Sequence, residues 1–170
     1  MSKMPDPAPH QQYAVLPWRR AQGLEILLIT SRETGRWVIP KGWPMAGHSE
    51  AESAEQEAYE EAGVRGRLAA QPLGHYDYRK RLRGGGKKPF RVEVFALEVT
   101  EILDLWPEAH QRRRQWVSPQ AAAELVHEPQ LAALMLAFAG EQSGEALPGP
   151  TWTQALRRML KAGLRFLGLR

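Results

Sequence analysis

The amino-acid sequence predicts an α+β sandwich in which one acidic helix packs against a mixed β-sheet. Short apolar segments typical of strands recur through the first 118 residues, one glutamate-rich helical segment interrupts them, and further helical segments follow. The 170 residues are enough for one ordinary domain with a core. The hydrophobic content of 43% and the charged content of 25% are typical of globular proteins.

The composition also excludes several classes of site. The chain has no cysteine, which excludes disulfides, thiolate metal sites and cysteine nucleophiles. Residues 1–12 lack the apolar core of a signal peptide, and no apolar run approaches the roughly 18 residues of a membrane-spanning helix. We therefore expect a cytoplasmic protein.

The chain before the acidic helix predicts a flexible arm followed by three strands. Residues 1–11 are polar and rich in proline, which is typical of an arm. The strands are expected at residues 13–18, 24–31 and 36–40. Gln22 and Gly23 suit the turn of a hairpin between the first two strands. Pro40 ends the third strand, and the glycine-containing segment 41–47 is expected to be a loop.

The acidic helix is predicted to run from Ser49 to Ala62. Ser49 and Glu52 have the spacing of a capping box, and Gly63 is a favourable residue just after a helix end. Three of its carboxylates share one helical face, where like charges repel by a few tenths of a kcal/mol per pair. They belong to Glu57, Glu60 and Glu61. Such a cluster is either a solvated surface or a binding site for a cation.

The chain after this helix predicts a long hairpin and then helices. Residues 65–80 read as one or two strands and 90–100 as another, joined by the glycine-rich loop 81–89. A final strand is expected at 113–118. Helices are expected after Ser118-Pro119, an N-cap followed by proline, and after Pro129.

The segment from residue 42 to residue 64 resembles the Nudix box, G-x5-E-x7-R-E-U-x-E-E-x-G-U, where U is aliphatic. The matching residues are Gly42, Glu57, Glu60, Glu61, Gly63 and Val64, with Ala58 as a small apolar equivalent. The preceding RWVIPKG also resembles the strand that leads into this box. Two positions differ, since His48 replaces the first glutamate and Gln56 the arginine. Their joint replacement avoids one unpaired charge, and their side chains can hydrogen-bond each other.

This resemblance implies a Nudix α/β/α sandwich and a hydrolase that acts on acid anhydrides in phosphorus-containing substrates. It assigns Glu57, Glu61 and the backbone carbonyl of Lys41 as ligands of Mg²⁺, with Mn²⁺ as a second possible ion. It makes Glu60 the candidate general base. Mg²⁺ prefers oxygen ligands and bridges substrate phosphates, so carboxylates on one helical face suit it. An ordinary acidic surface helix is the alternative, which the match at Gly42 disfavours.

Segments 30–42, 60–68 and 112–116 also resemble diphosphoinositol polyphosphate phosphohydrolases, which cleave diadenosine polyphosphates as well. This likeness spans residues 12–138 and predicts a polyphosphorylated small-molecule substrate. The expected substrate-binding residues are Ser31, Arg32, Arg79, Lys80, Arg81, Lys88 and Arg91. Most of them flank the glycine-rich loop, where arginine and lysine can bind phosphates. A solvated hairpin tip is the alternative reading of that loop.

The domain organisation predicted from the sequence has four parts. A flexible arm (1–11) precedes the Nudix domain (12–140), a linker (141–150) and a basic amphipathic helix (151–170). The net charge of +4 resides in this last segment, which has five basic residues and no acid, so no nucleic-acid partner is evident. The segment is expected to pack on its own domain or on a second subunit of a homodimer. An anionic membrane surface or another partner is the alternative.

Two other functions stay open at this point. One is a housecleaning Nudix hydrolase of nucleoside triphosphates or nucleotide sugars, and the other is a non-catalytic Nudix module that binds a phosphorylated ligand. The changes at His48 and Gln56 favour the binding module, whereas three retained carboxylates on one face argue against it. Trp43 is expected to pack within the protein, with stacking on a nucleobase as the alternative.

Overall fold

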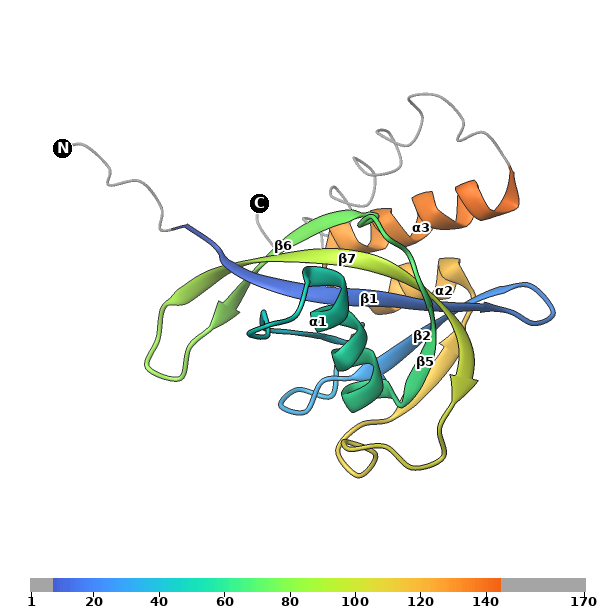
Figure 1. The fold of residues 1–170 in the computed structure, drawn as a ribbon. Coiled ribbons are helices and arrows are strands. Elements are labelled where there is room, and N and C mark those ends of the chain that lie inside the picture. Colours follow the sequence, from blue (N-terminus) through green and yellow to red (C-terminus); the bar gives the residue numbers. More distant parts are fainter. Residues whose placement is uncertain (1–7, 145–170) are drawn as a thin grey trace, which may run out of the picture. The chain divides into compact units, whose positions relative to one another are not determined.

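The computed structural model describes residues 8–144, and helices cover both faces of its single mixed sheet (Figure 1). The strands are β1 (His10–Arg20), β2 (Leu24–Thr30), β3 (Trp37–Val38), β4 (Lys41–Gly42), β5 (Val64–Leu68), β6 (Gly74–Arg81), β7 (Lys87–Ile102) and β8 (Arg114–Val117). The helices are α1 (Glu50–Glu57), the π-helical turn η1 (Ala58–Ala62), α2 (Pro119–Leu125) and α3 (Pro129–Ser143). The predicted sandwich, with the acidic helix on a mixed sheet, is confirmed.

Two long strands form the centre of the sheet. The strand order is β3-β2-β1-β7-β5, while β4 pairs with β1, β6 with β7 and β8 with β2. The β1–β7 pair is parallel and all the other pairs are antiparallel, which makes the sheet mixed. Figure 1 shows α1 lying across β1 and β7 on one face of the sheet.

The face under α1 and η1 carries one layer of the core. Val15, Leu27 and Phe95 belong to a buried cluster with Ala54 and Ala58 of the helical segment. Because alanine side chains are short, the helix can lie close to the strands, and Glu57 and Glu61 reach the backbone of β4.

The opposite face carries the second layer. Alternation along β1 turns Leu16 away from Val15, and Leu16 is fully buried. On this side α2 packs on β2, and Leu134 of α3 lies against Gly74 of β6. The chain forms two compact units that divide after residue 136, and the sandwich belongs to the first of them.

Several element ends differ from those predicted. β1 begins at residue 10, within the expected arm, and β4 lies in a segment expected to be a loop. Lys41 and Gly42 of β4 pair with Ala14 and Tyr13, a tertiary contact that overrides the local glycine signal. The β6–β7 hairpin leaves only 82–86 as its loop, and α3 continues into the first three residues of the expected linker.

The segment 151–170, predicted to be a basic amphipathic helix, lies outside the described residues. The homodimer and the cytoplasmic location stay predictions. Among residues 8–144, no helix has both the length and the apolar character needed to cross a bilayer.

Candidate active site

The acidic helix and β4 meet at the centre of the candidate site. The backbone N–H of Lys41 donates a hydrogen bond of 3.1 Å to Glu61 Oε2. The Glu57 carboxylate lies directly against Gly42, where the Cβ of any other residue would overlap it. The structure therefore brings together Glu57, Glu61 and the Lys41–Gly42 backbone.

Both ends of the helical segment are fixed as its sequence indicates. The Ser49 hydroxyl accepts a hydrogen bond from the Glu52 N–H at 3.2 Å, and the Glu52 carboxylate accepts one from the Ser49 N–H at 2.7 Å. This is the predicted capping box. At the other end, Gly63 has a left-handed φ of 63°, and the Trp106 ring occupies the space that a side chain there would need.

The last turn of this segment is π-helical, which the sequence did not indicate. The Gly63 N–H points at the carbonyls of both Ala58 and Tyr59, so the turn is wider than an α-helical one. Trp106 Nε1 donates to the Glu61 carbonyl at 3.2 Å and secures this turn from outside. Single π-helical turns are frequent at functional sites, and this one carries Glu60 and Glu61.

Arg112 is the main residue of the site that sequence reasoning missed. Its guanidinium donates to the Glu61 carboxylate, to Glu108 Oε2 at 2.5 Å and to the Thr30 carbonyl at 3.0 Å. Only 6% of the side chain is exposed. The run of three arginines at residues 112–114, which leads into β8, was the available signal, but the acidic partners of Arg112 within the site could not be read from it.

Glu60, the predicted base, faces a different neighbour from the other two glutamates. Its carboxylate accepts a hydrogen bond of 2.6 Å from the Gln56 amide. His48 instead lies near the Ala46 carbonyl, with Nδ1 at 3.2 Å. The sequence allowed a hydrogen bond between His48 and Gln56, but the Gln56 amide pairs with Glu60 instead, as the helical i,i+4 spacing favours.

Burial dominates the electrostatics of the site. It raises the pKa of Glu57 from 4.5 to about 7, and the neighbouring Glu61 and Glu60 charges add to this rise. Burial also raises the pKa of Glu61, against the opposing effects of Arg112 and the Lys41 N–H. The same cause lowers the pKa of the Lys41 ammonium, which Glu61 partly offsets. A cation bound here would relieve the repulsion between the carboxylates.

The donor set suits a hard divalent cation. Carboxylates and a backbone carbonyl are the oxygen ligands that Mg²⁺ accepts while keeping several waters. Gly42 leaves room for the Glu57 carboxylate beside the Lys41 backbone. Within residues 8–144, no three His, Asp or Glu side chains already converge on one metal position. Arg112 neutralises the charge of Glu61 through an ion pair. The residues therefore fit a bound metal, and the ligand assignments stay predictions.

Of the predicted substrate-binding residues, Arg32 contacts the Arg112–Glu108 pair of this network. Its Nη1 is 3.5 Å from Glu108 Oε1 and donates to Gln111 Oε1 at 3.2 Å. Glu108 thus joins Arg32 to Arg112. The Ser31 hydroxyl is used within its own turn, where it lies 2.6 Å from the Thr34 hydroxyl.

The basic residues of the β6–β7 hairpin divide between the two faces of the sheet. Lys80 is paired with Lys88 across the ladder and shares a face with Tyr78 and the Lys41 side chain. The other three predicted substrate-binding residues of this hairpin lie on the α1 face by the same alternation. They are Arg79, Arg81 and Arg91.

Arg91 and Lys80 have acidic partners. Arg91 donates two hydrogen bonds to the Asp77 carboxylate, at 2.9 and 3.1 Å, so its guanidinium is held away from a substrate. Lys80 lies 3.7 Å from Glu33, which connects the hairpin to the turn that carries Arg32. Lys80 and Lys88 therefore lie on the same face of the sheet as the Lys41 side chain, whereas Arg91 lies on the α1 face.

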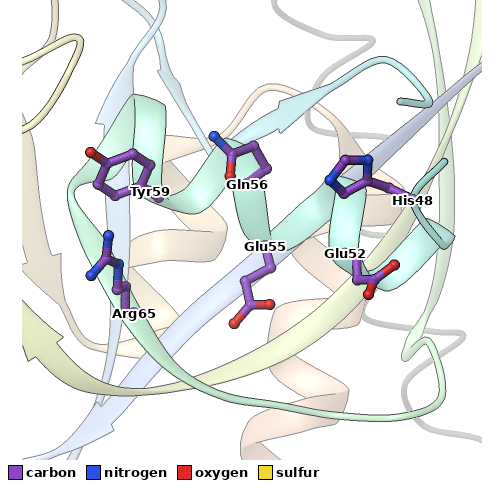
Figure 2. Close-up of a pocket in the computed structure, with 6 residues that line it drawn as sticks. All are labelled: His48, Glu52, Glu55, Gln56, Tyr59 and Arg65. Carbon is purple, nitrogen blue, oxygen red and sulfur yellow. The ribbon is translucent and has the colours of Figure 1, made fainter. Parts of the chain in front are cut away.

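A separate hollow of about 310 Å³ lies on the outer side of the acidic helix (Figure 2). Its lining residues are His48, Glu52, Glu55, Gln56, Tyr59 and Arg65. Figure 2 shows Tyr59 beside Arg65 at one end and His48 at the other, and the guanidinium carbon of Arg65 is 4.7 Å from the Tyr59 ring centre. Glu57 and Glu61 do not line it, so this hollow is not the candidate active site.

Replacing Gly42 by alanine is expected to displace the Glu57 carboxylate while leaving the fold intact, because the clash involves the end of a flexible side chain. Stabilisation of the variant by added Mg²⁺ should therefore fall by at least half in thermal unfolding measurements. Gly23→Ala is the matched control, since nothing lies within 4 Å of its added Cβ. Equal stabilisation of both variants by Mg²⁺ would contradict this role of Gly42.

The raised pKa of Glu57 predicts that the metal-free protein loses stability as pH rises from about 4.5 to about 7. In this window the folded state retains a proton that the unfolded state releases, so the free energy of unfolding falls with pH. Solvent screening at this partly exposed carboxylate limits the effect to about 1–2 kcal/mol. Urea unfolding in EDTA at pH 5 and pH 8 measures it. Glu57→Gln should be more stable than the wild type at pH 8 only, and an equal difference at both pH values would refute the assignment.

Comparisons with known proteins agree with this geometry. A family model described as NUDIX domain matches residues 9–138. Nudix hydrolase 13, mitochondrial, from Arabidopsis thaliana is 39% identical over 110 residues, covering 60% of this chain and 53% of that protein. Diphosphoinositol polyphosphate phosphohydrolase 3-alpha from Mus musculus is 31% identical over 146 residues, covering 81% and 85% respectively. The chain spans about half the length of the plant relatives that it matches.

The solved structures that resemble this one agree in fold. The Ap4A hydrolase binary complex from C. elegans aligns with a TM-score of 0.60 and 21% identity, covering 79% of this chain and 98% of that one. At this identity the likeness supports the sandwich alone.

Proposed function

Because this chain belongs to the Nudix family, we propose that it is a divalent-metal-dependent hydrolase that cleaves a phosphoanhydride bond in a polyphosphorylated small molecule. One observation supports this proposal above the others. Glu57 and Glu61, which repel each other and resist ionisation, both lie at the Lys41–Gly42 backbone. An acidic surface helix gains nothing from this burial, whereas a cation site does.

In this proposal Glu57, Glu61 and the Lys41 carbonyl hold Mg²⁺ or Mn²⁺. The bound ion would neutralise charge on the substrate phosphates and lower the pKa of water. Arg112 keeps the Glu61 carboxylate oriented through its hydrogen bond. Glu60 takes the proton from the attacking water, and the Gln56 amide holds its carboxylate in place.

The substrate class that we propose is a dinucleoside polyphosphate or a diphosphoinositol polyphosphate. The mouse relative's name indicates the second class, and the name of the C. elegans structure indicates the first. Lys41, Lys80 and Lys88 lie on one face of the sheet, and this group of positive charges suits a chain of several phosphates. Lys80 and Lys88 lie directly opposite each other, an arrangement that a polyanion would stabilise.

Phosphate release from a panel of compounds tests this function. The panel comprises diadenosine polyphosphates, diphosphoinositol polyphosphates, nucleoside triphosphates and a nucleotide sugar, each measured with Mg²⁺, with Mn²⁺ and with EDTA. We expect metal-dependent turnover of one of the first two classes. Preferred turnover of triphosphates or nucleotide sugars would identify a housecleaning hydrolase, and no turnover of any compound would favour a non-catalytic binding module.

A further inference from the structure

Trp43, which directly follows Gly42 of β4, is 53% exposed. Every other described tryptophan, tyrosine and phenylalanine within residues 8–144 is buried or half-buried. The expectation that Trp43 packs within the protein is thus only half fulfilled. One part of the indole contacts other rings and the rest faces solvent, one residue along the chain from Gly42.

The buried part of the indole is held by an aromatic cluster that consists of His10, Trp43, Tyr78 and Phe90. The Trp43 ring centre lies 5.7 Å from that of Phe90 and 6.0 Å from that of His10, with the His10 ring edge-on. Phe90 stacks in turn on Tyr78, with 5.1 Å between ring centres and 18° between planes. These contacts fix the orientation of the indole before any ligand arrives.

The cluster lies next to groups that suit phosphate. Lys41 Nζ is 5.8 Å from the Tyr78 ring centre, and strand alternation places Lys80 and Lys88 on the same face of the sheet. Only Gly42 separates Trp43 from Lys41, so their Cα atoms are at most about 7 Å apart. A molecule with phosphates at Lys41 can therefore place a planar group on Trp43.

We propose that the exposed face of Trp43 is the stacking site for the nucleobase of a nucleotide whose phosphates bind beside Lys41. This inference rests on the proposed hydrolase function and narrows its substrate to nucleotides. An inositol ring carries hydroxyl groups and has no aromatic face, so it cannot form the π-stacking contact with Trp43 that a nucleobase can form. Every base has an aromatic face, so stacking alone favours ligands that contain a base but does not distinguish one base from another.

Two probes that contain no phosphoanhydride separate this inference from the proposed reaction. Adenosine 5′-monophosphate and ribose 5-phosphate carry the same phosphate and sugar, and they differ in the base. Titration calorimetry or ligand-observed NMR in Mg²⁺ buffer measures their dissociation constants. With the wild type we expect the adenosine compound to bind about 5- to 150-fold more tightly.

The variants assign this difference to Trp43. Trp43→Ala should remove the preference and leave ribose 5-phosphate binding unchanged, whereas Trp43→Phe should keep part of it. Leu105→Ala is the control for loss of an exposed apolar side chain, because Leu105 is 85% exposed and lies outside the cluster. Circular dichroism checks that each variant is folded.

Equal binding of the two probes by the wild type, or a preference that survives in Trp43→Ala, would overturn the stacking site. Either result is compatible with turnover in the substrate panel, so this inference can fail while the hydrolase function stands. Conversely, a base preference that depends on Trp43, found without turnover, would support the nucleotide site and contradict the hydrolase.

Discussion

Glu57→Gln and Glu61→Gln are each expected to lower metal-dependent hydrolysis by at least about 100-fold. Glutamine keeps the shape of the side chain and removes the negative charge that holds the cation. A bound metal contributes several kcal/mol to the stabilisation of the transition state, and each 1.36 kcal/mol is a factor of ten in rate. Steady-state kinetics at saturating and limiting Mg²⁺ measure the loss.

Glu55→Gln is the matched control for this pair. Glu55 belongs to the same helical segment but lines the outer hollow, so the rate of metal-dependent hydrolysis by Glu55→Gln should stay within about twofold of the wild-type rate. A similar loss in all three variants would indicate a general effect of helix charge. Unchanged turnover in Glu57→Gln and Glu61→Gln would contradict the assignment of the metal ligands.

Arg112→Met should destabilise the fold by about 3–5 kcal/mol, the usual cost of removing one partner of a buried ion pair. The change leaves Glu61, Glu108 and the Thr30 carbonyl without their shared guanidinium. Urea unfolding at pH 7 in EDTA measures this loss. The free energy of unfolding of Arg112→Lys should lie between those of Arg112→Met and the wild type. One ammonium keeps the charge but cannot reproduce the geometry of the guanidinium fork.

Arg113→Met is the control for this substitution. The Arg113 side chain lies 5.8 Å from the Trp37 ring centre, a surface contact whose loss should cost less than about 1 kcal/mol. In the double variant Arg112→Met/Glu61→Gln, the second change should recover part of the stability, since the unpaired charge is gone. Strictly additive effects would show that the Arg112–Glu61 pair does not account for the loss.

Local signals in the sequence were enough to predict the acidic helix and its ends. Ser49, Glu52 and Gly63 act through neighbours within the same segment, and the structure shows each in the expected capping role. The approach of Glu57 and Glu61 to Gly42 was also predictable, because all three occupy their expected positions in the Nudix box.

Other features depend on contacts between distant segments, which composition and spacing do not encode. Arg112 is 51 residues from Glu61 in the sequence, and no local pattern links the two. The ion pair between Arg91 and Asp77 depends on the register of the β6–β7 hairpin, which places the two residues opposite each other. The strand pairing of Lys41 was missed because the glycines of its segment suggested a loop.

The most direct test of the metal site is a crystal structure of the protein soaked in Mn²⁺, with anomalous diffraction to locate the ion. The account predicts an anomalous peak coordinated by the Glu57 and Glu61 carboxylates and the Lys41 carbonyl oxygen. The Arg112 guanidinium should remain hydrogen-bonded to Glu108 in that structure. A peak elsewhere on the protein, or no peak at millimolar Mn²⁺, would contradict the claim that these three residues hold the catalytic ion.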